Sequence, residues 1–316
     1  MNIIKLNEFN NNEALCKIWN DEYGFIYPIS LELFNRNIKN AYDEASYVAV
    51  ENDKAIGFII GKIWQDKYEV GNYSKCGWIS LIFVHKQYRN RGIGSMLLQK
   101  AEEQFNKLNK EIVYIGRDYL NYFPGLPSDM KNSLLWFEKR GYDQSYLTYD
   151  LISKNKDILP LSNNQIKYRF ACSKDKEALI SFMEKNWPGR WTKELIDYWN
   201  DGGTGSEYLL GLDNDKICAF AKVNYPITNV NLISYSLTWR NRFSSLGGIG
   251  PLGVDNEYRG RKIGRDIVVC AKNHLIESGT SDIIIDWTGL LDFYRPMGFE
   301  VWKSYYYLTK KIEKEI

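Results

Sequence analysis

Two short stretches of the chain combine basic residues with glycine in a way that suits phosphate binding. They are Arg89-Asn90-Arg91-Gly92-Ile93-Gly94 and Arg259-Gly260-Arg261-Lys262-Ile263-Gly264. Each follows an apolar run and precedes an amphipathic one, so each is predicted to join a strand to the start of a helix. The first N–H groups of a helix lack an internal partner and carry partial positive charge, and glycine lets a phosphate approach the backbone. The pattern indicates two pyrophosphate-binding turns, although an ordinary strand–turn–helix connection has the same features.

One carboxylate stands where it could remove a proton from an amine. Asp286 ends the apolar run 283–285 and is followed by Trp287. A carboxylate at the end of a buried strand, beside an aromatic side chain, can have a raised pKa and can bind an amine. Asp286 is therefore our candidate general base. A helix cap or a loop carboxylate has the same sequence context, and Asp292, Glu257 or a chain of water molecules are the alternatives for the base.

A tryptophan-rich segment is the candidate for binding a substrate. Trp187 and Trp191 flank Arg190 closely in the sequence. Indole rings stack on the faces of sugars, and a guanidinium group binds hydroxyl or anionic groups. We expect aromatic residues from later segments to join them, namely Tyr225, Trp239 and Trp287. The alternative is that these side chains only pack one domain against another.

The chain contains an internal repeat. An Asn-Asp-Lys turn between two apolar runs, the basic–glycine stretch and a closing glycine–aromatic pair occur twice in the same order. The offset between the copies is 162 residues (215 − 53), 170 residues (259 − 89) and 157 residues (298 − 141), respectively. Three features in one order at similar offsets indicate two copies of one domain. We place the copies at residues 1–152 and 166–316, joined by a polar linker at residues 153–165.

Each copy is predicted to have the same order of elements. A short strand is followed by amphipathic helices, a hairpin, and a strand that leads into the basic–glycine stretch. A helix then starts, at Ile93–Phe105 in the first copy and Ile263–Glu277 in the second. A further strand, Ile112–Ile115 or Ile283–Asp286, precedes a short helix, the glycine–aromatic turn and a last strand. This order predicts an α/β (α+β) fold.

Together these features resemble the GNAT superfamily of acyl-CoA-dependent N-acetyltransferases. The pyrophosphate loop of that family reads Gln/Arg-x-x-Gly-x-Gly/Ala, which residues 89–94 match fully and residues 259–264 match except at Lys262. The family's Tyr-x-x-x-Gly-Phe element appears as residues 294–299. The resemblance covers nearly the whole chain as two tandem domains. It implies that each domain is a mixed, mostly antiparallel, twisted sheet flanked by helices.

The resemblance also implies roles for particular residues. Acetyl-CoA would be the co-substrate, with no metal, and each basic–glycine stretch would bind its pyrophosphate. The backbone of the preceding strand would bind the thioester and pantetheine, at Leu252, Gly253 and Val254 in the second copy and at Ile82, Phe83 and Val84 in the first. The family's general acid is a tyrosine four residues before the closing glycine. That position is Tyr294 in the second copy and Phe137 in the first.

These residues lead us to expect that the second domain catalyses and that the first is a degenerate partner. Core packing beside Phe293 is the alternative role for Tyr294. The arrangement is similar to tandem amino-sugar acetyltransferases that act on glucosamine or glucosaminides. We therefore expect a small-molecule primary amine as the acceptor, with an amino sugar as the best guess. Aminoglycosides, polyamines, cysteinyl pseudo-disaccharides and peptide amines are alternatives, as is a non-catalytic protein that binds or senses acyl-CoA.

Composition excludes several other classes of protein. The 316 residues contain 41 Lys and Arg against 39 Asp and Glu, a balance that disfavours binding to nucleic acids or anionic membranes. The five cysteines form no C-x-x-C pair and there are only two histidines, which argues against a disulfide framework, a structural zinc site and histidine-based triads. The sequence has neither a long apolar run nor a signal-peptide pattern, so we expect a cytoplasmic protein.

Overall fold

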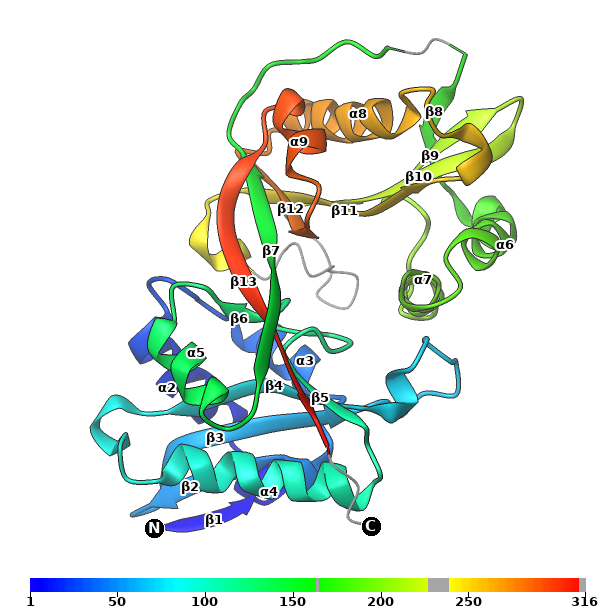
Figure 1. Cartoon of the computed structure of the whole chain (residues 1–316). Helices are drawn as coiled ribbons and strands as arrows, with labels where there is room; N and C mark the ends of the chain where they lie inside the picture. The colour runs from blue at the N-terminus through cyan, green and yellow to red at the C-terminus, as the bar shows by residue number, and fades with distance from the viewer. Residues whose placement is uncertain (163–164, 227–238, 313–316) are drawn as a thin grey trace. The chain divides into compact units, whose positions relative to one another are not determined.

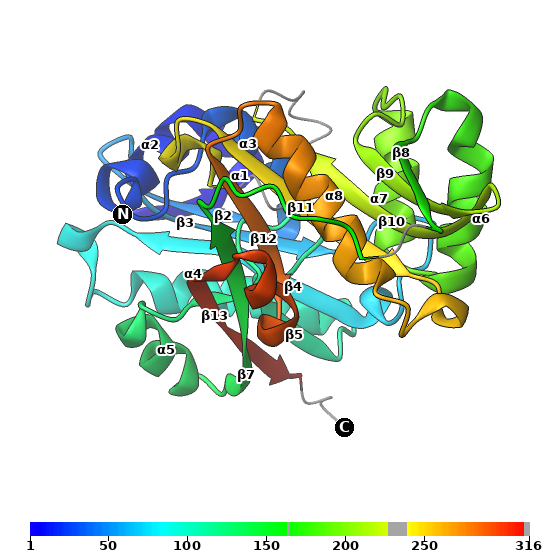
Figure 2. The same cartoon turned by 90° about the horizontal axis from the view of Figure 1, so that it is seen from above.

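The chain folds into two compact units, each with a mixed α/β architecture (Figures 1 and 2). The computed structural model describes residues 1–162, 165–226 and 239–312. Unit 1 comprises Met1–Thr148 and Ser304–Ile316, and unit 2 comprises Tyr149–Lys303. The predicted α/β fold, with a mostly antiparallel sheet in each half, is confirmed.

Unit 1 is built on a sheet in which only one neighbouring pair of described strands is parallel, namely β4 and β5. Its strands are, in spatial order, β1 (Asn2–Lys5), β2 (Tyr47–Glu51), β3 (Lys54–Ile63), β4 (Cys76–Val84), β5 (Ile112–Ile115) and the end of β13 (Glu300–Lys311), with β6 (Leu126–Pro127) paired to β13. Its α-helices are α1 (Leu6–Phe9), α2 (Asn12–Tyr23), α3 (Leu31–Ile38), α4 (Ile93–Lys107) and α5 (Lys131–Glu138).

Unit 2 repeats this plan. Its strands are β8 (Lys167–Phe170), β9 (Tyr208–Asp213), β10 (Lys216–Asn224), β11 (Leu246–Val254), β12 (Asp282–Thr288) and the end of β7 (Asp143–Ser153). Its α-helices are α6 (Lys176–Asn186), α7 (Arg190–Asn200), α8 (Ile263–Glu277) and α9 (Leu291–Tyr294). Among these described strands, again a single pair, β11 and β12, is parallel. Ile263, Ile267, Ala271 and Leu275 recur every four residues along α8 and are buried against the sheet, as expected for an amphipathic helix.

The last strand of each sequence copy pairs within the other unit. Ile152 of β7 is opposite Ile284 of β12 in unit 2, and Thr309 of β13 is opposite Tyr114 of β5 in unit 1. The units therefore do not coincide with the predicted segments 1–152 and 166–316. The two copies offer similar sheet edges, so the apolar pattern of a strand does not specify which edge it joins.

The predicted linker, residues 153–165, begins at the last residue of β7. Its residues 163–164 lie outside the described residues. The preceding part is attached to α8: the Leu159 N–H donates to Asn273 Oδ1 (3.1 Å), and Asn273 Nδ2 donates to the Leu159 carbonyl (2.8 Å). Among the helices that the structure describes, none has the length and apolar character needed to cross a membrane.

Candidate functional site

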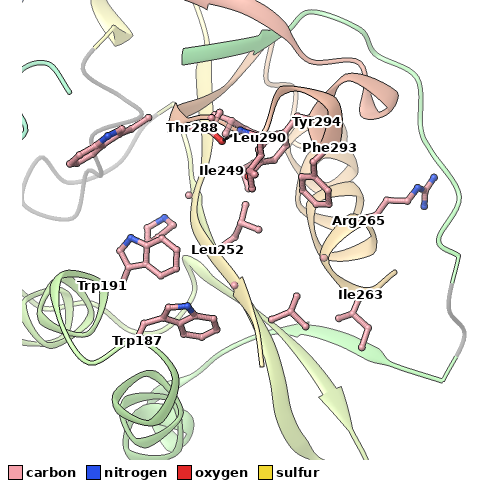
Figure 3. Close-up of a pocket in the computed structure, with 18 of the residues that line it drawn as sticks. Trp187, Trp191, Ile249, Leu252, Ile263, Arg265, Thr288, Leu290, Phe293 and Tyr294 are labelled. Carbon is pink, nitrogen blue, oxygen red and sulfur yellow. Dashed lines mark hydrogen bonds between the residues drawn. The ribbon is translucent and has the colours of Figure 1, made fainter. Parts of the chain in front are cut away.

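A cavity of ≈ 920 Å³ opens in unit 2 where β11 and β12 diverge (Figure 3). The parallel pairing of the two strands stops at Gly248 and Ile284, although β11 continues to Val254 and β12 to Thr288. The start of α8, the start of α7 and α9 complete the lining. Figure 3 shows Trp187 and Trp191 on one side of β11, and Phe293 and Tyr294 on the other.

The start of α8 forms the wall of this cavity that is suited to phosphate. The first N–H to bond within the helix is that of Asp266, which donates to the Lys262 carbonyl (3.0 Å). The N–H groups of Ile263, Gly264 and Arg265 precede it, and all three residues line the cavity. Such a helix end, with its dipole, attracts a phosphate. This is a fit to the pyrophosphate of a CoA thioester.

Most of the predicted cofactor residues of the second copy line this cavity. They are Leu252, Gly253, Val254, Arg259, Gly260, Lys262, Ile263 and Gly264. Arg261 does not share this wall: its guanidinium lies 5.2 Å from the centre of the Tyr258 ring and 3.7 Å from Asp213 Oδ2. The turn needs two residues with left-handed backbone conformations, and these are Gly260 (φ 78°) and Lys262 (φ 61°). Lysine rarely adopts this conformation, so the departure from the family motif at Lys262 carries backbone strain.

Asp286 lies at the divergence of the strands and lines the same cavity. A side chain added at Gly250 would come within 3.3 Å of Asp286 Oδ1, so the carboxylate packs over the backbone of β11. Burial, and after it the negative charges of Asp150 and Glu194, raise the pKa of Asp286 to about 7, against the opposing effect of Arg190. A carboxylate with this pKa can accept a proton near neutral pH.

Tyr294 lines the cavity from α9 and is only 5% exposed. Its ring packs edge-on against Phe293, with 4.8 Å between the ring centres. Burial first, and then the charge of Asp286, raise the pKa of Tyr294 well above its ordinary value of 10. The hydroxyl therefore keeps its proton at neutral pH and can donate it.

Four of the predicted substrate residues, Trp187, Arg190, Trp191 and Trp287, also line the cavity. The Trp187 and Trp191 ring centres are 5.7 Å apart. The Arg190 guanidinium lies 4.4 Å from the centre of the Trp287 ring, and its Nε donates to Glu194 Oε1 (2.7 Å). Glu194 was missed in the sequence, where the (i, i+4) spacing from Arg190 on a predicted helix is the feature that could have revealed it.

The other two predicted substrate residues lie elsewhere. The Tyr225 hydroxyl is hydrogen-bonded to His274 Nε2 (2.9 Å) in the last turn of α8. Trp239 is buried against Trp302 and donates its indole N–H to Asp150 Oδ2 (3.0 Å). Both side chains are used in packing, a role that the abundance of aromatic residues could not distinguish from ligand binding.

Unit 1 has a corresponding cavity of ≈ 1200 Å³, where the pairing of β4 and β5 stops at Ile79 and Ile115. Eight predicted cofactor residues line it, namely Ile82, Phe83, Val84, Arg89, Asn90, Gly92, Ile93 and Gly94, while the Arg91 guanidinium lies against the Tyr88 ring (5.2 Å). Phe137 and Gly116 occupy the positions that correspond to Tyr294 and Asp286. Neither residue has a side chain that can transfer a proton.

Metal ligands are not grouped in the described part of the chain: no set of three or more His, Cys, Asp or Glu residues there is arranged to hold an ion.

Comparison with known proteins supports a common origin for the two halves. The sequence model of the Acetyltransferase (GNAT) family matches residues 12–122 and again residues 176–299. Among curated protein sequences, none matches this chain.

Several solved structures share this fold over nearly the whole of this chain. One is the GCN5-related glucosamine N-acetyltransferase region of a fungal multi-domain GH3 β-N-acetylglucosaminidase, with TM-score 0.85 and 23% identity, over 98% of this chain and 38% of that one. This chain therefore spans well under half the length of that protein. The second is a GCN5-related N-acetyltransferase from Sphaerobacter thermophilus, with TM-score 0.70 and 18% identity, over 98% and 95% of the two chains. The third is a tandem GNAT protein from the clavulanic acid biosynthesis pathway, with TM-score 0.70 and 12% identity, over 100% and 99%.

Proposed function

The chain belongs to the GNAT acetyltransferase family, in which acetyl-CoA is the co-substrate, and we propose that its unit 2 acetylates the primary amine of an amino sugar such as glucosamine. The observation that carries this proposal is the content of one cavity. A helix N-terminus, the buried Tyr294 hydroxyl, the Asp286 carboxylate and a wall of tryptophans all line it.

The donor would bind along β11 and the start of α8. Arg259 and Lys262 add positive charge beside the first N–H groups of the helix, which suits a pyrophosphate. The part of β11 beyond Gly248 is not paired with β12, so its backbone can bind the amides of pantetheine. Acetyl-CoA supplies the acyl group as a thioester.

The acid and base would act on opposite ends of one displacement. The amine nitrogen forms a bond to the acyl carbon as the carbon–sulfur bond breaks. Asp286 takes the proton that the nitrogen loses, and Tyr294 gives a proton to the departing sulfur. The pKa of about 7 suits Asp286 to the first role, and the raised pKa of Tyr294 keeps it protonated for the second.

The amino sugar is supported by the chemistry of the remaining wall. Trp187, Trp191 and Trp287 offer apolar faces on which a sugar ring can stack. Arg190 and Glu194 offer a donor and an acceptor for hydroxyl groups. The fold shared with a glucosamine N-acetyltransferase region points to the same substrate class.

Unit 1 would not catalyse, because Phe137 and Gly116 replace the acid and the base. It would serve as a degenerate partner that retains the phosphate-binding turn. One experiment tests both assignments. Release of the CoA thiol from acetyl-CoA is measured with glucosamine and with other amines, first for the wild type and then for Tyr294→Phe.

We expect release that requires an amino sugar and falls about 100-fold or more in Tyr294→Phe. Tyr142→Phe is the matched control, because Tyr142 is equally buried but lies in unit 1, where it bonds to Glu102. The control should keep wild-type activity. Full activity in Tyr294→Phe would remove the assigned acid, and no release with any amine would disprove the proposed reaction.

A further inference from the structure

We propose that Asp150 is a positioning residue for the acceptor site of unit 2, where its carboxylate fixes the backbone of Trp287 and orders the base beside it. The inference rests on the proposed function, because it concerns the same reaction. Asp150 belongs to the first sequence copy, but β7 carries it into unit 2.

Asp150 joins two segments of unit 2 through a buried carboxylate. It is 2% exposed. Its Oδ1 accepts the backbone N–H of Trp287 (3.1 Å), and its Oδ2 accepts the indole N–H of Trp239 (3.0 Å). The first bond ends on the residue next to Asp286. A carboxylate with both oxygens bound to N–H groups holds its partners in one geometry.

The bond to Trp287 is needed because the strand is irregular there. The pairing of β12 with β7 is interrupted between Ile285 and Thr288, so Asp286 and Trp287 are outside the regular ladder. Trp287 has a φ of 46°, in the left-handed region that a bulky residue rarely adopts. Strained backbone of this kind persists where surrounding groups fix it, and it is concentrated at functional sites. Here it turns Asp286 and Trp287 together into the cavity.

The position in unit 1 that corresponds to Trp287 has a similar backbone but different neighbours. Arg117 also has a left-handed backbone (φ 65°), and it corresponds to Trp287 in the repeat. The strand residue that corresponds to Asp150 is Tyr307, whose ring lies 4.0 Å from the Arg117 guanidinium. Unit 1 thus has a left-handed residue at the same position, but it has an aromatic ring where unit 2 has a carboxylate. Asp150 and the candidate base Asp286 are thus both present in unit 2, and the corresponding positions of unit 1 have neither carboxylate.

Four titratable or charged groups act on the Asp286 carboxylate. They are Asp150 from β7, Glu194 and Arg190 from α7, and Tyr294 from α9. After burial, the charge of Asp150 is the largest contribution that raises the pKa of Asp286. Loss of that charge should lower the pKa, so that the base works at more acidic pH.

The test is the pH dependence of kcat/KM for the amine in full-length Asp150→Asn. The rate of the wild type should rise through a limb near pH 7, which is the deprotonation of Asp286. In the variant we expect this limb about one pH unit lower, because the charge is removed. We also expect an approximately tenfold higher KM for the amine, because an amide oxygen can accept only one of the two N–H groups and the link between Trp239 and Trp287 is broken. A purely structural role would reduce the rate at every pH and leave the limb in place, and that result would overturn the inference.

Three further variants separate charge from shape. Asp143→Asn changes an exposed carboxylate on the same strand and should leave both the limb and KM unchanged. Asp150→Glu keeps the charge and should keep the limb near its wild-type position. Asp150→Ser removes the charge with a smaller side chain, so its limb should move as in Asp150→Asn. Asp150→Ser replaces Asp150→Asn in the test if the asparagine variant does not fold.

A readout without turnover distinguishes this inference from the proposed function. The Asp286 carboxyl carbon is titrated by NMR in protein labelled at the aspartate side chains, with Asp286→Asn to assign the resonance. A lower pKa in Asp150→Asn supports the role of Asp150 even if no amine is acetylated. An unchanged pKa contradicts it even if the enzyme is active.

Discussion

Replacement of Asp286 by asparagine should slow catalysis and at the same time stabilise the protein, in a way that depends on pH. With a pKa of about 7, roughly half of the carboxylate is ionised at pH 7 and about 1% at pH 5. The wild-type rate should therefore rise between pH 5 and 8. An asparagine side chain cannot accept the proton, so the variant should lose this limb and be about 100-fold or more slower at pH 8.

Asp286→Asn should slow the reaction but increase the stability of the folded protein. The pKa of Asp286 is raised in the folded state above its usual value of 3.8, so the folded protein binds this proton more tightly than the unfolded chain does. The wild type is therefore most stable below pH 4 with respect to this group, and it loses stability as the pH rises towards 7. The difference of about three pH units corresponds to about 4 kcal/mol. Because the carboxylate is partly exposed to the cavity, we expect about half of that, or about 2 kcal/mol, at pH 8.

An asparagine at this position stays neutral, so Asp286→Asn should unfold at a temperature roughly 4–8 °C above the wild type at pH 8, and at nearly the same temperature at pH 4. Thermal unfolding followed by circular dichroism at both pH values measures this. Asp292→Asn is the matched control, because the Asp292 side chain is 93% exposed and Asp292 was one of the alternative bases. It should change neither activity nor stability. An Asp286→Asn protein with the same Tm difference at both pH values would refute a buried, pKa-shifted base.

Two further substitutions test the walls of the cavity. Lys262→Gly should relieve the left-handed backbone at the start of α8 and raise the free energy of unfolding by about 1 kcal/mol in urea titrations, whereas a loss of stability would mean that the lysine side chain has a structural role of its own. Gly253→Ala would place a methyl group 2.4 Å from the Trp187 ring, so it should displace Trp187 and raise KM for the amine several-fold; an unchanged KM would exclude Trp187 from the acceptor wall.

The local elements of this fold could be predicted from the sequence. The helix expected at Ile263–Glu277 has these limits in the structure, and the one expected at Ile93–Phe105 ends two residues later. Strand β5 also has its predicted limits. Each of these depends on the spacing of apolar residues and on the turn beside them, which are local properties. The turn residues identified the helix N-termini for the same reason.

Contacts between distant parts of the chain could not be predicted in this way. The exchange of β7 and β13 pairs strands more than 100 residues apart, and nothing in a strand's own pattern specifies its partner. Asp150 was missed as a consequence, since it was assigned to the other copy. Trp239 was predicted to bind substrate for a related reason, because its indole N–H is bonded to Asp150 on the exchanged strand β7.

The differences between the two units favour catalysis over a purely acyl-CoA-binding role for unit 2. Three positions change together from unit 1 to unit 2: phenylalanine to Tyr294, glycine to Asp286, and tyrosine to Asp150. The raised pKa of Asp286 means that its ionised form is disfavoured in the folded protein, and binding of a CoA thioester would not need this carboxylate. A protein that only bound the donor would be more stable with a neutral residue in place of Asp286. Proton transfer by the proposed acid and base would explain why unit 2 carries this destabilising carboxylate, and the stability measurements on Asp286→Asn quantify its cost directly.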